Sequence, residues 1–210
     1  MQILTNKRQN TLVVPPLYLG SVDFYAEMLK HEKICFDINA PYDDMRAINR
    51  CRIATAGGVQ TLTIPLAKPE YGRHTQIKEL RISSHGKWEH LHWGAIYSAY
   101  GKAPFFEYIE PDLKHLYERH GEWLADFNIA LHNLIADYMQ LDIPQVKSTE
   151  NSEKISPLYA GKDDVESTVG SYWQVRAEKF GFTPHLSILD IALNEGPQGI
   201  FALLKSGSEK

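Results

Sequence analysis

Short apolar runs, separated by a helical pattern, fill the first part of the chain. Leu12 to Val14 is stopped by two prolines, Gly20-Ser21 opens a helical pattern that reaches Leu29, and a second apolar run spans Lys33 to Phe36. Strand, helix and strand in this order are the opening of an α/β sheet, in which ligands collect at the carboxyl ends of parallel strands. The pattern predicts a small, mostly parallel sheet.

A β-hairpin is expected next. From Arg50 the chain reads CRIAT, and VQTLTIPL follows Gly57-Gly58, so two β-rich runs flank a glycine turn. A further short strand is expected at Leu80 to Ile82. The hairpin is an excursion from the parallel sheet.

The second half of the chain has helical periodicity. The stretch WEHLHWGAIYSAYGKAPFFEY (88–108) carries apolar residues at helical spacing up to Gly101, and both Pro104 and Pro111 suit a first helical turn. An apolar stripe from Trp123 to Leu141 predicts the most regular helix. The polar residues 144–157 predict a surface connection, followed by a helix in LSILDIAL (186–193) and a shorter one through 200–204. We therefore expect one α/β domain over 1–210 with a helical C-terminal half.

Composition and charge narrow the function classes. Lysine and arginine number 22 against 26 acidic residues, the formal charge is -4, and no basic run exists, so no nucleic-acid partner is expected. No apolar run is long enough to span a bilayer and the first residues lack a secretory signal, which predicts no membrane span and a cytoplasmic location. Cys35 and Cys51 are expected to be buried free thiols.

Metal and phosphate motifs are absent from the sequence. On a helix, His90 and His92 would point about 200° apart and could not share one metal ion, so no metal is expected. No glycine-rich phosphate loop is present, and the cofactor stays open, with a nucleotide or an acyl donor compatible with the sequence. The PPLYLGS segment (15–21) fits either an anion site or a tight turn between strand and helix.

Cationic and amide side chains offer candidate ligand contacts. Asn49, Arg50 and Arg52 lie where the hairpin begins and suit a carboxylate or a phosphate, although a solvated strand end explains them too. Lys102 is presented on a proline-stiffened turn between aromatic residues. These side chains are candidates for binding a negatively charged group.

The combination of INRCRI (48–53), LTIPL (62–66), the block 88–108, LADFN (124–128) and LSILDIALNEGP (186–197) resembles the WbqC-like proteins. The resemblance implies a protein of the kind encoded in bacterial surface-polysaccharide (O-antigen) clusters, for which transfer of glycine to sugars has been suggested. Longer members carry a glycine- and tyrosine-rich segment, which YAGKDDVESTVGSYW (159–173) does not reproduce. The family-like positions are Pro16, Gly20, Asn49, Arg50, Pro65, Trp88, His92, Tyr97, Tyr100, Lys102, Pro104 and Phe106.

The function expected from these features is transfer of a small acyl or aminoacyl group to a sugar or sugar nucleotide. His92 would be the general base, and Lys102, with Arg50, would bind a carboxylate or phosphate. A core role for His92 is the alternative, because Ile96 and Ala99 share its helix face. Arg50, His92 and Lys102 are expected to meet at one concave site, whose wall is formed by a set of aromatic residues, Tyr18, Trp88, Tyr97 and Tyr100. The alternative is a non-catalytic module that binds a glycan or a partner protein on the same aromatic residues.

Overall fold

The computed structural model describes residues 9–42, 46–67, 74–145 and 167–205. The elements are, in chain order, β1 (Gln9–Val14), α1 (Val22–Met28), β2 (His31–Phe36), η1 (Arg46–Ile48), β3 (Arg50–Thr55), β4 (Gly58–Thr63), η2 (Ile77–Glu79), α2 (Trp88–Tyr100), α3 (Phe106–Glu118), α4 (Leu124–Tyr138), α5 (Ala177–Phe180), α6 (Ile188–Glu195), η4 (Gly196–Gly199) and α7 (Ile200–Leu204). The predicted α/β class is confirmed, with helices in the C-terminal half.

Two small sheets carry the strands. β1 and β2 pair in parallel, with Val13 opposite Cys35, and α1 forms the connection between them. β3 and β4 form the predicted antiparallel hairpin, which turns at Ala56 and Gly57. The parallel pair and the hairpin are separate two-stranded sheets in the described chain.

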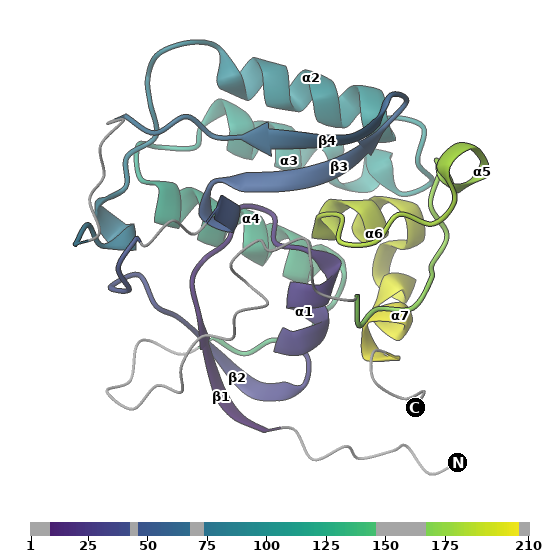
Figure 1. Cartoon of the computed structure of the whole chain (residues 1–210), viewed down its shortest axis with the longest axis horizontal. Coiled ribbons are helices and arrows are strands. Elements are labelled where there is room, and N and C mark those ends of the chain that lie inside the picture. Colours follow the sequence, from purple (N-terminus) through teal and green to yellow (C-terminus); the bar gives the residue numbers. More distant parts are fainter. Residues whose placement is uncertain (1–8, 43–45, 68–73, 146–166, 206–210) are drawn as a thin grey trace.

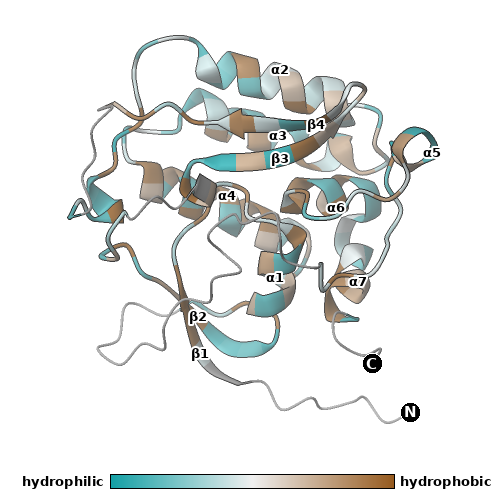
Figure 2. Cartoon of the chain, in the orientation of Figure 1, coloured by the Kyte–Doolittle hydropathy of each residue, from teal (hydrophilic) through white to brown (hydrophobic). Residues whose placement is uncertain are grey.

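Helices pack around the hairpin (Figure 1). α2 contacts both β3 and α3, and α3 in turn contacts α4, so the hairpin and three helices form successive layers. α6 joins this group through β3 and α4, and it also contacts α1. Each long helix carries both hydrophobic and hydrophilic residues (Figure 2), as expected for helices with one face in a core. One continuous hydrophobic cluster runs through all these elements.

The predicted helices exist with small changes at their ends. The aromatic stretch is helical over Trp88–Tyr100 and Gly101 caps it, while the stripe from Trp123 gives the helix Leu124–Tyr138. Cys35 and Cys51 are buried free thiols, as expected. Leu80 to Ile82 makes only isolated bridges, Leu66 with Ile82 and Arg81 with Trp123. Beyond Gln145, the predicted connection at 144–157 lies outside the described residues.

The prediction for Pro111 was wrong, because this proline lies inside α3 and not in its first turn. Proline removes one helical hydrogen bond and crowds the carbonyl four residues earlier, which here belongs to Glu107. Both residues are exposed, so water can satisfy that carbonyl. An exposed position is what makes the proline tolerable.

The PPLYLGS segment forms a tight turn, and amides of this turn and of the first turn of α1 bond within the protein. Tyr18 N donates to Ala47 O, Val22 N donates to Leu186 O, and the Ser21 hydroxyl accepts from Phe24 N. Residues 15–20 are buried. These amides are therefore not available to an anion, which favours the tight-turn interpretation. Within the described residues, no helix is long and apolar enough to cross a bilayer.

Gly196, at the end of α6, generates a stability prediction. Its φ is +59°, and a Cβ there would lie 2.5 Å from a ring carbon of Phe105. Gly121 has a similar φ of +71°, but a Cβ at that position would meet no atom within 4 Å. We expect Gly196→Ala to lower the free energy of unfolding by about 2–4 kcal/mol, from backbone strain plus overpacking, and Gly121→Ala by about 1 kcal/mol. Urea denaturation measures both, and equal losses would contradict the steric contact.

Candidate functional site

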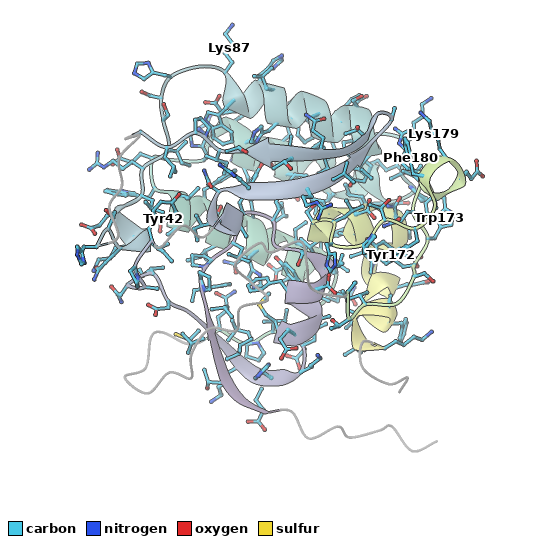
Figure 3. All side chains as sticks on the ribbon, viewed as in Figure 1. Tyr42, Lys87, Tyr172, Trp173, Lys179 and Phe180 are labelled. Carbon is cyan, nitrogen blue, oxygen red and sulfur yellow. The ribbon has the colours of Figure 1, made fainter. Side chains whose placement is uncertain are left out.

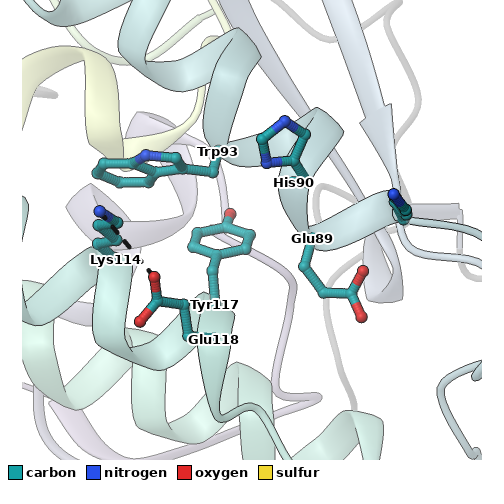
Figure 4. Close-up of a pocket in the computed structure, with 7 residues that line it drawn as sticks. Glu89, His90, Trp93, Lys114, Tyr117 and Glu118 are labelled. Carbon is teal, nitrogen blue, oxygen red and sulfur yellow. Dashed lines mark ion pairs between the residues drawn. The ribbon is translucent and has the colours of Figure 1, made fainter.

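A cleft of about 480 Å³ lies between α2 and α3 (Figure 4). Its volume is within the range that small-molecule sites occupy. Seven residues line it, Lys87, Glu89, His90, Trp93, Lys114, Tyr117 and Glu118. None of these seven residues is among the site residues predicted from the sequence.

Helix geometry explains why these residues face one another. On α2 the lining residues Glu89, His90 and Trp93 are one, three and four positions apart, and on α3 Lys114, Tyr117 and Glu118 repeat that spacing. Residues three and four apart share a helix face, so each helix presents one such face to the cleft. The short turn 101–105 makes the helices run in opposite directions, which places the start of α2 beside the end of α3.

Charged side chains of both signs surround an aromatic wall. The rings of Trp93 and Tyr117 lie 6.4 Å apart between their centroids. Lys114 lies 4.0 Å from Glu118 across one turn of α3, and Glu89 lies 3.4 Å from Nε2 of His120. These pairs are exposed or half-buried, so they are weak and can rearrange around a ligand.

Behind the cleft, three side chains form a buried hydrogen-bonded chain. Tyr117, one of the lining residues, is almost fully buried and its hydroxyl lies 2.5 Å from the hydroxyl of Tyr18. The Tyr18 hydroxyl lies 2.9 Å from Nδ1 of His92, whose ring also bonds the backbone of Thr63. Figure 4 shows the Tyr117 hydroxyl directed toward α2, away from Glu118.

The positions of the protons in this hydrogen-bonded chain follow from the groups that each member bonds. Burial lowers the pKa of His92 to about 4, although the bond to the Thr63 backbone acts in the opposite direction, so the imidazole is neutral at pH 7. Its N–H donates to the Thr63 carbonyl, Nδ1 accepts from Tyr18, and Tyr18 accepts from Tyr117. Burial also raises the pKa of both tyrosines and of the nearby Cys51 thiol, which keeps all three groups protonated.

Comparison with known proteins identifies the family. A sequence profile of the WbqC-like protein family matches residues 16–159, more than half of the chain and all the residues that line the cleft. The chain belongs to the WbqC-like protein family. An uncharacterized protein of Mycobacterium tuberculosis, Rv1507c, is 27% identical over 196 residues, with 75% of this chain and 83% of that protein covered. No solved structure matches the chain.

Several of the residues predicted for the WbqC-like site lie in the core. Trp88 is 5% exposed and packs edge-on against His92, while Tyr18 and Tyr100 are fully buried. The Tyr100 hydroxyl accepts from Ala54 N, which ties α2 to β3. Asn49 is buried too, and its amide donates to Ile64 O. These buried side chains can position the residues of a site, but they cannot contact a ligand directly.

The structure does not bring Arg50 and Lys102 together. β3 runs beside α2. At one end, Thr63, which pairs with Arg50 across the hairpin, bonds to His92, and at the other end Ala54 bonds to Tyr100. Four residues of strand, or about 13 Å, separate Arg50 from Ala54, and Lys102 lies beyond Tyr100. The two exposed cations therefore occupy opposite ends of the α2–β3 contact, and His92 lies buried between the helix and the hairpin.

The two remaining predicted residues lie nearer the surface. Tyr97 is 55% exposed on α2, one turn beyond Trp93, and Arg52 is half-buried on β3. Among the described residues, no group of three or more histidine, cysteine, aspartate or glutamate side chains could hold a metal ion. His90 and His92 do face different ways, since His90 is exposed in the cleft while His92 is buried.

The burial of His92 generates a pH prediction. In the unfolded chain a histidine has a pKa of about 6.5, whereas that of folded His92 is about 4. Between these two pH values the unfolded state binds a proton that the folded state does not bind. Stability is therefore lost as the pH falls, by about 2 kcal/mol between pH 7 and pH 5 for this one group. We expect His92→Gln to remove that part of the pH dependence.

Urea denaturation of wild type and variant at pH 7 and pH 5 measures the effect. His90→Gln is the matched control, because His90 is exposed on the same helix and its substitution should leave the pH dependence as it is. An unchanged pH dependence in His92→Gln would show that His92 is not held neutral in the fold.

Proposed function

We propose that this WbqC-like protein attaches a small acyl or aminoacyl group, such as glycyl, to a sugar or sugar nucleotide in surface-polysaccharide synthesis, and that the sugar binds in the α2–α3 cleft. The single observation that supports the proposal is the composition of the cleft, in which Trp93 lies among charged side chains. An aromatic face suits the apolar side of a sugar ring, and carboxylate and ammonium groups suit its hydroxyls.

The charged lining residues then each have a chemical task. Glu89 and Glu118 accept hydrogen bonds from sugar hydroxyls, and Lys114 donates to them. Lys87, which makes no ion pair within the described residues, binds a phosphate or carboxylate of the substrate at the open start of α2. Each task uses a side chain that is exposed or half-buried and has at most a weak ion pair.

His90 provides the proton acceptor in this proposal, in place of His92. A general base must reach the proton that it removes, and His90 is exposed in the cleft. His92 has protein partners on both ring nitrogens, so it affects the cleft only through Tyr18 and Tyr117, whose position it fixes. Lys102 lies outside the residues that line the cleft.

A non-catalytic glycan-binding module is the second candidate. Enzyme active sites often contain a histidine whose pKa is shifted. In α2 the histidine whose pKa is lowered by burial is His92, and it does not line the cleft, which favours a binding module. The two candidates differ in what His90→Gln should do. In a transferase, His90→Gln loses the turnover of wild type and retains sugar binding. In a binding module, wild type itself shows no turnover with any donor, and sugar binding is the activity that is measured.

The binding step can be tested through Trp93. We expect Trp93→Ala to weaken binding of the sugar about tenfold, equivalent to about 1.4 kcal/mol, because the stacking face is removed. Titration calorimetry with a panel of monosaccharides and nucleotide sugars measures the change.

Trp173→Ala is the control for this prediction. Trp173 is 52% exposed near α5, away from Lys87 at the cleft (Figure 3), so its loss should leave sugar affinity unchanged. Equal affinities in wild type and Trp93→Ala, with thermal unfolding showing both folded, would remove the cleft as the sugar site.

A further inference from the structure

Asp23 and His185 form a hydrogen-bonded pair outside the cleft. Asp23 is in the first turn of α1 and only 3% exposed, and its Oδ2 accepts a 2.8 Å hydrogen bond from Nδ1 of His185. His185 stands 162 positions later, just before α6, and its side chain is 21% exposed. The pair therefore joins a buried carboxylate to an imidazole that reaches the surface.

The carboxylate is held rigidly from its other side. Oδ1 of Asp23 accepts from the Ser167 hydroxyl and from Thr168 N, both at 2.8 Å. These donors use the capacity of Oδ1 and leave Oδ2 to the imidazole. A carboxylate with donors on both oxygens is held in one orientation, with Oδ2 directed at His185.

The same bond determines which ring nitrogen carries the proton. A carboxylate oxygen accepts hydrogen bonds, so Nδ1 of His185 is the donor in this contact. In the neutral ring the lone pair then resides on Nε2, and no described residue provides Nε2 with a partner. A carboxylate that fixes the tautomer and the orientation of a histidine in this manner is the arrangement that serves acid–base catalysis.

The backbone of His185 is strained in a way that aims its ring. Its φ is +57°, in the left-handed region that costs a non-glycine residue about 1 kcal/mol or more. The next two residues are tied down, since Leu186 O accepts from Val22 N and Ser187 N donates to Arg52 O. The neighbouring contacts thus hold a conformation that directs the imidazole toward Asp23.

We propose that Asp23 and His185 form an acid–base site that activates water, a hydroxyl or an amine toward the acyl carbon of a small activated ester or thioester. His185 is the catalytic residue and Asp23 is its positioning residue. The proposal is independent of the sugar-binding role of the α2–α3 cleft, because none of the residues in the pair lines that cleft.

The step balances without a further reactant. Nε2 of His185 takes the proton from the nucleophile as its oxygen or nitrogen forms a bond to the acyl carbon. The bond from that carbon to the leaving oxygen or sulfur breaks, and the leaving group departs with the electron pair. His185 then returns its proton to the leaving group, so the pair ends as it began.

Hydrolysis of p-nitrophenyl acetate by the full chain tests the site. The rate with wild type should exceed the uncatalysed rate. In His185→Gln this enzyme-dependent rate should fall at least about tenfold, since acid–base catalysis contributes about a hundredfold or more. His115→Gln, at an exposed histidine of α3 outside the cleft, should retain the wild-type rate. Equal rates in wild type and His185→Gln overturn the proposal.

Nitrogen-15 NMR of the imidazoles tests the role of Asp23 and needs no catalysis. In wild type the His185 ring should carry its proton on Nδ1, and Asp23→Asn, if it folds, should shift the ring toward the Nε2–H form and lower the hydrolysis rate about tenfold. A wild-type ring protonated on Nε2 overturns the proposal whether or not the variant folds. Sugar binding, which depends on Trp93, is unaffected by either result.

Discussion

The buried chain Tyr117–Tyr18–His92 is the constraint on which the rest of the site depends. Its members come from α3, from the turn before α1 and from α2, and the two bonded pairs join residues 74 and 99 positions apart. Each polar tip is buried, so each needs its partner, and an unpaired hydroxyl or imidazole would cost about 1–3 kcal/mol. The bonds therefore fix the rotation of α2 about its own axis. With His92 turned inward, the face that carries His90 and Trp93 must turn toward the cleft.

The same rotation explains which parts of the site could be predicted. The hairpin, α2 and α4 follow from local patterns, a glycine turn between β-rich runs and apolar stripes, and these are present in the sequence itself. Trp88 and His92 share the stripe of Ile96 and Ala99, which the structure shows to be the core face. The polar face with Glu89, His90 and Trp93 was the signal for a cleft, and a helical projection of α2 would have separated the two faces.

Other parts depend on contacts that no local pattern records. Tyr117 becomes part of the cleft only because α3 folds back on α2, and its spacing alone is that of any core residue. Asp23 and His185 meet across 162 positions, through two turns that pair Ser21 with Ser187. The distance between Arg50 and Lys102 is likewise set by the direction of β3 along α2. Residue type indicated candidate chemistry at Arg50 and Lys102 but not at Tyr117, Asp23 or His185, and topology decided which groups meet.

The two candidate sites differ in how they are built, and this difference bears on their chemistry. The cleft is formed by one helical hairpin within residues 87–118, its ion pairs are exposed, and it suits a ligand that exchanges with water. The Asp23–His185 pair combines a buried, fully bonded carboxylate with a surface imidazole, so its electrostatic interaction is little screened and its geometry is fixed before a substrate arrives. The cleft, where His90 is the proposed proton acceptor, is thus expected to rearrange around its ligand, whereas the geometry for proton transfer at the pair is preorganised. The family profile ends at residue 159, so it spans the whole cleft but only the Asp23 half of the pair.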